Sequence, residues 1–255
     1  MIDLSFLKYF YILESKIMEN LENMPRHVAI IPDGNRRWAR KRTLSAWMGH
    51  KKGSENLETL LEVFVELKIP YFSFWGSSQD NITKRPKEEI DQLLKIFKEE
   101  FARLADSDKV HDNEIRINII GSWREQFPDD VKDSMEKAIR ATEDYDKYFY
   151  NFFIAYSGID EMRNAVENIA ELKTTDPNLI IDEALIKSQL LTKDLPPVDF
   201  LIRTGGEPHN SGGFMMWDVT DSQLFFSEKL WPDFSNKDLK DAIMEYSHRE
   251  RRMGK

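Results

Sequence analysis

The sequence predicts an α/β fold, a single domain in which helices flank a central, mostly parallel β-sheet. Segments rich in β-branched and aromatic residues alternate along the chain with longer segments whose apolar residues recur at helical spacing, and this alternation is typical of parallel sheets covered by helices. A chain of 255 residues with 41% hydrophobic residues can bury one large core. We expect residues 1–24 to form an N-terminal helical extension and residues 25–255 to form the main domain.

The expected elements begin with a short buried strand in HVAII, which ends because Pro32 cannot continue a ladder. Further strands are predicted in YFSFW from Tyr71, IRINIIG from Ile115, YFYNFFIAY from Tyr148 and DFLIRT from Asp199. Helices are predicted after Gly53, after Pro86, over Val131 to Thr142, around Glu161, around Asp182, and from about Asn236 to Arg249. In such sheets, ligands bind outside the carboxyl ends of the strands.

Charge and composition exclude several classes of protein. A formal net charge of -9 and a sequence pI near 5.2 argue against nucleic acid as a partner. The absence of cysteine excludes disulfides and thiolate metal sites and favours a cytoplasmic location. No apolar run reaches the length of a membrane span. The first 24 residues are interrupted by charges, so the helix expected there either docks on the body of the protein or lies at a lipid interface.

The stretch that follows the first strand combines one acid with a cluster of basic residues. Asp33 ends the strand, Gly34 and Asn35 tolerate turn geometry, and a helix is expected to open over Arg36 to Arg42. Backbone N–H groups and cationic side chains together favour an anionic ligand. A carboxylate beside a phosphate needs a bridging divalent cation. We interpret the stretch as a phosphate site with a metal-bridging Asp33; the alternative is an ordinary solvated helix face.

A second candidate phosphate site follows the strand DFLIRT. Arg203 stands at the expected strand end, and glycines with Ser211 follow in the loop RTGGEPHNSGG, which offers cationic and backbone donors. Polar residues also follow the other strands, in GSSQDN from Gly76 and at Ser157. The chain has no Walker motif and no G-x-G-x-x-G. Two phosphate sites at one sheet edge are therefore expected.

Six sequence blocks, in order, resemble the motifs of the cis-prenyltransferases, the undecaprenyl diphosphate synthase family. The blocks are HVAIIPDGNRRWARK, GHKKG, SSQDNITKRPKEE, DFLIRTGGE, LFFSEKLWPDF and RERRMGK, and they span nearly the whole chain after Met24. The resemblance implies a cis-prenyltransferase-like catalytic domain, usually a homodimer, with a hydrophobic tunnel for the growing chain. It also implies two isoprenoid diphosphates and a Mg²⁺ ion as ligands.

The resemblance also implies roles for individual residues. Asp33, Asn81 and Arg85 would be catalytic, with Asp33 acting through Mg²⁺ and the other two orienting the reacting centres and aiding proton loss. The allylic diphosphate would be bound by Gly34, Asn35, Arg36, Arg37 and His50, and isopentenyl diphosphate by Arg203 and Ser211. Trp38 and Ser77 would contact substrate, and Arg252 and Gly254 would complete the site across the dimer interface.

Some positions depart from the family pattern. An Arg that often precedes the GH block is Ala46 here, and Arg36 or Arg42 would have to replace it. His209 replaces an expected Arg, in a loop longer than usual. The Glu linked to Mg²⁺ in the family is Gln223, and a neutral amide is a poorer ligand for a hard cation than a carboxylate. These changes indicate a divergent branch of the family.

The main functional hypothesis is an enzyme that condenses isopentenyl diphosphate with an allylic prenyl diphosphate to give a cis-polyprenyl diphosphate, a precursor of a glycan or cell-wall lipid carrier. Peripheral membrane contact would assist product release. The alternatives are a non-catalytic family member that supports a partner subunit, and a phosphate-ester hydrolase using Asp33 and a metal. Several aromatic residues either line a prenyl tunnel or belong to the core, with core favoured: Phe72, Phe74, Trp75, Phe97, Phe101, Phe152 and Phe153.

Overall fold

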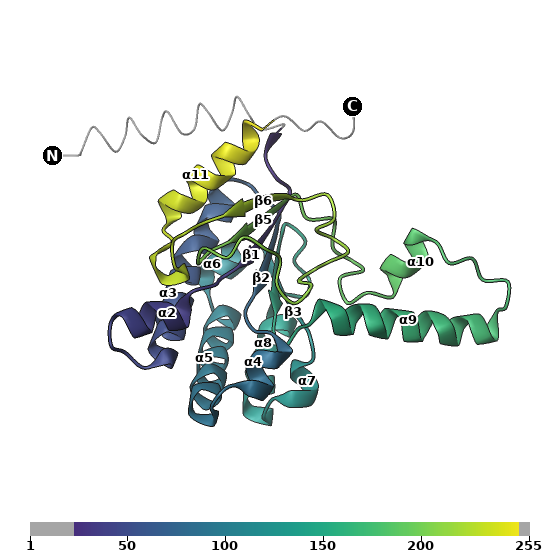
Figure 1. The fold of residues 1–255 in the computed structure, drawn as a ribbon, viewed down its shortest axis with the longest axis horizontal. Coiled ribbons are helices and arrows are strands. Elements are labelled where there is room, and N and C mark those ends of the chain that lie inside the picture. The colour runs from purple at the N-terminus through teal and green to yellow at the C-terminus, as the bar shows by residue number, and fades with distance from the viewer. Residues whose placement is uncertain (1–22, 250–255) are drawn as a thin grey trace.

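A computed structural model describes residues 23–249 and contains one six-stranded sheet (Figure 1). The strand order is β3-β4-β2-β1-β5-β6, and every pair is parallel. The strands are β1 (His27–Ile31), β2 (Tyr71–Trp75), β3 (Ile115–Ile120), β4 (Tyr148–Phe153), β5 (Phe200–Arg203) and β6 (Gln223–Phe226). The predicted fold class is confirmed: a single α/β domain whose parallel sheet is flanked by helices.

The two faces of the sheet are covered differently. Because side chains alternate along a strand, Val28 and Ile30 of β1 enter the larger core, whereas Ala29 and Ile31 enter a smaller one. The larger core includes apolar residues of the long helices, and the smaller core includes Phe214 and Met215 from the irregular segment before β6. The face of the sheet to which Ala29 and Ile31 point is therefore covered partly by the loop that carries Ser211.

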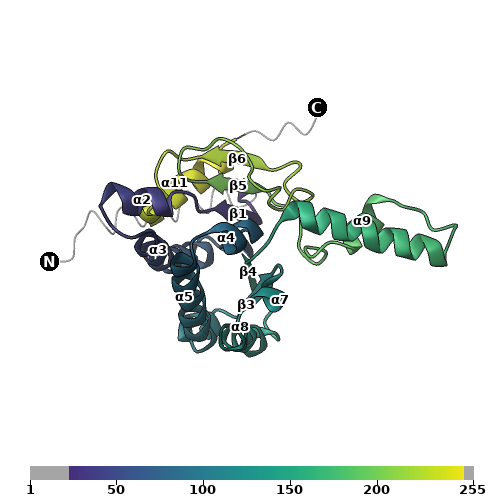
Figure 2. The same cartoon turned by 60° about the horizontal axis from the view of Figure 1, so that its bottom comes forward.

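The long helices occur where apolar residues recur at helical spacing. They are α3 (Ala46–Glu66), α5 (Lys87–Ala105), α8 (Asp129–Thr142), α9 (Gly158–Thr175) and α11 (Asn236–Ser247), joined by shorter helices α2 (Asn35–Lys41), α4 (Gln79–Lys84), α6 (Asp108–Asp112), α7 (Trp123–Gln126) and α10 (Glu183–Ser188) and the 3₁₀ turn η2 (Trp231–Asp233). In both ribbon views α9 extends away from the body (Figures 1 and 2), and Figure 1 shows α10 on the same extension. No helix within residues 23–249 is both long and apolar enough to cross a bilayer.

The central position of β1 determines where the site forms. Ile31 pairs with Arg203 of β5 on one side, and Ile30 pairs with Phe74 of β2 on the other. The carboxyl ends of β1, β2 and β5 therefore open onto one edge of the sheet, which is where doubly wound folds bind ligands. The expected N-terminal extension, apart from Asn23 and Met24, lies outside the described residues, as do Arg252 and Gly254.

Candidate active site

Asp33 lies at this edge between two arginines. One carboxylate oxygen is 3.1 Å from Nη2 of Arg37, on the first turns of α2, and the other is 2.9 Å from Nη2 of Arg203, at the end of β5. Thr204 donates its hydroxyl to the Asp33 carbonyl at 2.8 Å. Arg203 also donates to the carbonyl of His209 at 2.7 Å, and its buried Nε has no hydrogen-bond partner within residues 23–249. Two predicted phosphate-binding arginines thus share one carboxylate.

The turn after Asp33 depends on glycine. Gly34 has a φ of +114°, and a Cβ there would lie 2.8 Å from Cδ2 of Leu230. Gly49 and Gly53 of the GHKKG block let α3 approach α2, because a Cβ at Gly49 would lie 2.1 Å from the Asn35 carbonyl. Asn35 is held by its amide, which donates to Pro32 O at 3.3 Å. The glycines therefore bring α2 and α3 together at the end of β1.

Glu89, on the first turn of α5, gathers three cationic or titratable groups. Its Oε1 is 3.1 Å from His50 Nε2, 3.1 Å from Arg85 Nη1 and 3.5 Å from Arg36 Nε. Hydrogen bonding from His50, together with the charges of Arg85 and Arg36, holds the pKa of Glu89 below its usual value despite burial. Burial lowers the pKa of His50. The imidazole is thus neutral near pH 7 and Glu89 is ionised.

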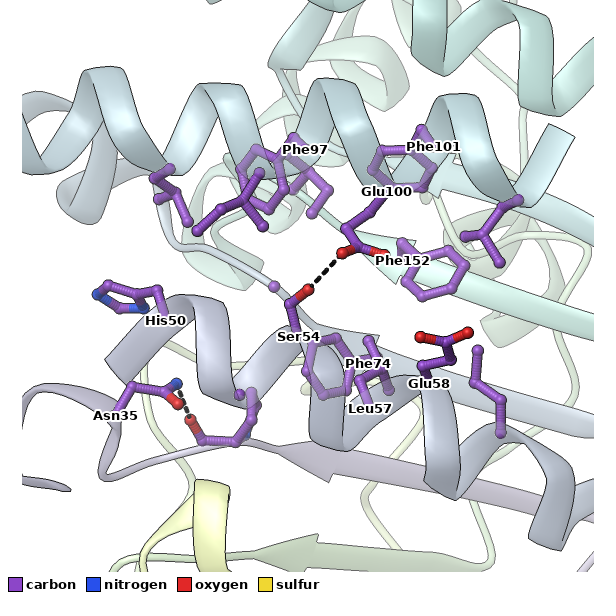
Figure 3. Close-up of a pocket in the computed structure, with 18 of the residues that line it drawn as sticks. Asn35, His50, Ser54, Leu57, Glu58, Phe74, Phe97, Glu100, Phe101 and Phe152 are labelled. Carbon is purple, nitrogen blue, oxygen red and sulfur yellow. Dashed lines mark hydrogen bonds between the residues drawn. The ribbon is translucent and has the colours of Figure 1, made fainter. Parts of the chain in front are cut away.

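Three pockets meet at Pro32, Asn35 and His50, which line all of them. We call them the basic, polar and apolar pockets. The basic pocket is lined by Asp33, Arg36, Arg37, Arg40 and Arg85; the polar pocket by Asp33, Ser77, Asn81, Arg85, Arg203 and Ser211. The apolar pocket runs between α3 and α5 over the sheet, past Phe74, Phe97, Phe101 and Phe152 (Figure 3). A cationic surface thus opens onto an apolar one.

Those four aromatic residues both line the apolar pocket and belong to the larger core, so the two sequence-based interpretations do not exclude each other for them. Phe72 and Phe153 are fully buried in the two cores. Trp75 lines the polar pocket and stacks on Phe214, with ring centroids 5.3 Å apart.

The remaining predicted polar residues are held by local hydrogen bonds. Asn81 and Ser78 form a capping box at the start of α4, with the Asn81 N–H donating to Ser78 Oγ at 3.0 Å. Ser77 is buried, and its Oγ accepts from the Ala155 N–H at 2.9 Å. These bonds fix the direction of the segment that leads to Arg85, whose φ and ψ are extended before Pro86.

Two predicted residues lie apart from this group. The indole of Trp38 donates to Asp233 at 2.7 Å, and Arg42 lies over its ring at 4.1 Å, so neither side chain lines the three pockets. Ala46 does line the basic pocket, beside Arg36 and Arg40. Of the two arginines expected to replace the missing cation, the structure therefore brings Arg36 to the pocket and turns Arg42 away.

Gln223 is separated from Asp33. It pairs with Phe200, three residues before Arg203 along β5, which corresponds to about 10 Å along the sheet. Its amide oxygen accepts from Arg249 at 3.2 Å. Gln223 and Asp33 therefore do not form one metal site within the described part of this chain.

Asp33 itself fits the donor set that Mg²⁺ prefers. Mg²⁺ is usually bound by one or two carboxylates together with substrate phosphates and water. The Asp33 side chain is 31% exposed and faces both arginine-lined pockets. No cluster of three or more His, Cys, Asp or Glu side chains suited to a metal occurs within residues 23–249. Asp33 would thus hold the ion together with substrate oxygens.

Sequence reasoning missed two contributors to this site. Arg40 adds a third arginine of α2 to the basic pocket, one turn beyond Arg36 and Arg37. Glu89 holds His50 and Arg85. The basic residues that recur in NRRWARK could have identified Arg40 from the sequence.

Comparisons with known proteins agree with this geometry. The model of a family described as putative undecaprenyl diphosphate synthase matches residues 31–254. A Pyrococcus horikoshii protein named tritrans,polycis-undecaprenyl-diphosphate synthase (geranylgeranyl-diphosphate specific) is 40% identical, covering 98% of this chain and 96% of its own. An isoprenyl transferase of Thermus thermophilus is 34% identical, covering 96% and 95%.

Among solved structures, lavandulyl diphosphate synthase from Lavandula x intermedia, in complex with dimethylallyl diphosphate, is similar with a TM-score of 0.82 and 30% identity. The match covers 92% of this chain and 100% of that one. The family model and the relatives cover nearly the whole main domain. The chain therefore belongs to the undecaprenyl diphosphate synthase family and is an enzyme of the cis-prenyltransferase type.

Proposed function

We propose that this enzyme condenses isopentenyl diphosphate with an allylic prenyl diphosphate to give a cis-polyprenyl diphosphate. The observation that carries the proposal is the junction at Asn35 and His50, where the basic pocket opens into the apolar pocket. A prenyl diphosphate has a multiply charged head and an apolar tail, and the two pockets are suited to those two parts.

In the proposed reaction the allylic C–O bond breaks, a C–C bond forms to the double bond of isopentenyl diphosphate, and one proton leaves. Negative charge grows on the departing diphosphate, so donors placed around it lower the barrier. Arg36, Arg37 and Arg40 with the N–H groups at the start of α2 supply those donors. Asp33 would hold Mg²⁺, and the bound ion would neutralise further charge on the same group.

The second substrate is assigned to the polar pocket. Arg203 and Ser211 are proposed to bind isopentenyl diphosphate, with Nε of Arg203, which has no hydrogen-bond partner within residues 23–249, as one donor. Asn81 and Arg85 are proposed to orient the reacting carbons and assist proton loss, since they line the polar pocket next to His50. Arg252 and Gly254 of a second copy would complete this pocket.

The wider biological setting is also a proposal. The name of the P. horikoshii relative, which specifies geranylgeranyl diphosphate, supports this compound as the allylic substrate. The product would serve as a glycan or cell-wall lipid carrier precursor. A cytoplasmic homodimer with peripheral membrane contact for product release is proposed. Exposed apolar side chains on and after α9 support association with a second copy: Ile159, Val166, Ile180, Ile181 and Leu191.

The test is incubation of the purified protein with labelled isopentenyl diphosphate, Mg²⁺ and, in separate reactions, dimethylallyl, geranyl, farnesyl or geranylgeranyl diphosphate. We expect labelled prenyl diphosphates, with geranylgeranyl diphosphate giving the highest kcat/KM. Release of free phosphate without formation of a longer prenyl product would instead identify a hydrolase.

A further inference from the structure

The buried side chain of Tyr156, which follows β4, connects α9 to the loop that carries Ser211. Its hydroxyl lies 2.6 Å from one carboxylate oxygen of Glu161, on the first turn of α9, and accepts from the N–H of Met215 in the loop at 3.3 Å. Burial raises the pKa of Tyr156, so the hydroxyl keeps its proton and donates it to Glu161. The other oxygen of Glu161 accepts from the Thr192 N–H at 3.2 Å. Tyr156 thus holds the loop from below with a fixed hydrogen-bond direction.

The backbone of this loop is strained at Met215. Its φ is +47°, a value that few residues other than glycine adopt, whereas Gly212 and Gly213 reach φ values of +55° and +63° without a side chain. A strained backbone persists only where its surroundings hold it. At Met215 the N–H donates to Tyr156, and the carbonyl accepts from the Asp218 N–H at 2.9 Å. The shape of the loop therefore depends on the Tyr156 hydroxyl.

Phe214 anchors the same loop with its ring. The ring is fully buried and stacks on Trp75, with centroids 5.3 Å apart. It also meets the rings of Phe153 and Tyr156 edge-on, at 5.1 and 6.1 Å. The Phe214 N–H donates to the Ser211 carbonyl at 3.0 Å and closes a turn around that residue. The place of Ser211 in the polar pocket thus follows from where the Phe214 ring is held.

The loop also contacts Arg203, the other residue proposed to bind isopentenyl diphosphate. Arg203 donates to the carbonyl of His209, two residues before Ser211, at 2.7 Å. None of residues 204–216 lines the basic pocket. Glu207 lies 3.7 Å from Arg37, but its side chain is 45% exposed, and such a pair is weak. A shift of the loop would therefore disturb the polar pocket more than the basic one.

We propose that Tyr156 is a positioning residue for the isopentenyl diphosphate subsite. This inference rests on the proposed prenyl-transfer function. Tyr156 does not line the polar pocket and so acts through the loop. Its hydroxyl holds Met215 in the strained conformation, which seats Phe214 in its aromatic contacts and places Ser211 beside Arg203. Loss of the hydroxyl weakens the binding of isopentenyl diphosphate and leaves the allylic substrate unaffected.

The test is Tyr156→Phe, which removes the hydroxyl and keeps the ring. Calorimetry with isopentenyl diphosphate alone and with geranylgeranyl diphosphate alone, each with Mg²⁺, measures binding without turnover, because the proposed reaction needs both. We expect the Kd of isopentenyl diphosphate to rise about fivefold or more and that of geranylgeranyl diphosphate to change by less than about twofold, as for one lost buried hydrogen bond that acts on one subsite. The two KM values should differ in the same way.

Phe214→Leu is an independent variant of the same anchor, since it keeps an apolar side chain but loses the stack on Trp75. It should give the same selective rise. Tyr150→Phe is the matched control. Tyr150 is 1% exposed, donates its hydroxyl to the Leu61 carbonyl at 2.7 Å and belongs to the larger core, and it lines none of the three pockets. Its loss should lower stability and leave both Kd values unchanged.

The outcomes separate a positioning role from a structural one. An unchanged Kd of isopentenyl diphosphate in Tyr156→Phe and Phe214→Leu, or an equal rise for both substrates, would overturn the proposal. A selective rise in a protein whose wild type forms no prenyl product would support the positioning role and contradict only prenyl transfer. A wild type that does not bind isopentenyl diphosphate would overturn both.

Discussion

At the scale of single residues, Asp33 is the carboxylate that two arginines share. Because Asn keeps an oxygen acceptor for Arg203 but loses the charge needed for Mg²⁺, we predict that Asp33→Asn lowers kcat by about 10²- to 10³-fold. The unfolding free energy should fall by about 1 kcal/mol or less, since the side chain is 31% exposed. Steady-state kinetics and urea unfolding measure the two effects. Near-normal turnover of the variant, or full wild-type activity in chelator, would contradict the assignment.

Arg37 and Arg203 reach opposite oxygens of Asp33 from different elements. Arg37 lines the basic pocket and Arg203 the polar pocket. We therefore predict that Arg203→Ala raises the KM for isopentenyl diphosphate more than that for the allylic substrate, and that Arg37→Ala does the reverse. Each lost contact should raise the relevant KM by about tenfold or more. Equal effects of both variants on both substrates would indicate one shared diphosphate site.

The sequence contained a signal for Glu89 but did not reveal the role of this residue in the site. Residues 89, 93, 97, 101 and 105 are the buried positions of α5, and all but the first are apolar. An acid that continues such a stripe indicates a buried, paired charge. The partners His50 and Arg85 were identified from the sequence, but the pairing depends on how α3 packs against α5. That packing is not encoded at any single position.

At the scale of elements, the segments with a strong apolar pattern were predictable, whereas β6 and the short helices α4, α6 and α7 were not. Strands β1 to β5 and most of the long helices match the sequence expectations to within a few residues, but α3 begins at Ala46, whereas this helix was expected only after Gly53. Strand β6 was missed because it is a four-residue edge strand whose Leu224 is 45% exposed. Helices α4, α6 and α7 have four to six residues, which is too short for helical periodicity to appear. The strand order could not be predicted because it depends on long-range pairing.

His27 of β1 contacts β2 and the segment before β5, and its burial predicts a pH dependence of stability. Its ring nitrogens contact Ser73 of β2 at 2.8 Å and the Pro196 carbonyl before β5 at 2.9 Å. Burial lowers its pKa from 6.5 to about 4. Below pH 6.5 the unfolded chain therefore binds a proton that the folded chain excludes, so stability is lost as the pH falls. We predict that about 3 kcal/mol of unfolding free energy disappears between pH 6.5 and pH 4 because of this residue.

Urea unfolding at a series of pH values measures this effect. His27→Gln should be less stable than the wild type at pH 7 and should have a flatter profile between pH 6.5 and pH 4. His248→Gln is the control, because His248 is exposed and should leave the profile unchanged. Parallel profiles for the wild type and His27→Gln would show that His27 is not the source.

At the scale of the whole molecule, we expect the proposed site to include the tail of a second copy. The resemblance assigns Arg252 and Gly254 to the site of the partner subunit, and Arg249 is the last described residue before them. We predict that deleting residues 252–255 leaves a folded dimer whose turnover falls by at least about tenfold, since cationic donors to a diphosphate are lost. Size-exclusion chromatography and steady-state kinetics measure the two properties. Full activity of the truncated protein would exclude a role for the tail.

Subunit mixing tests whether the tail acts across the interface. In a mixed dimer of the truncated chain with Asp33→Ala, one site combines an intact Asp33 with an intact tail from the other chain. We predict that activity recovers in part after subunit exchange, because each mixed dimer then holds one complete site. Proven exchange with no recovery would show that each chain uses its own tail.

The central position of β1 also affects the order in which the strands pair while the protein is being synthesised. Asp33 and Arg203 are 170 residues apart in sequence, yet they meet because β1 pairs with β5. A nascent chain can pair β1 with β2 early, but the other edge of β1 stays open until most of the protein has left the ribosome. Such distant pairing slows folding and leaves an unpaired apolar strand edge exposed in the meantime. We therefore expect the edge of the sheet that carries Asp33 and Arg203 to be among the last parts of the molecule to form.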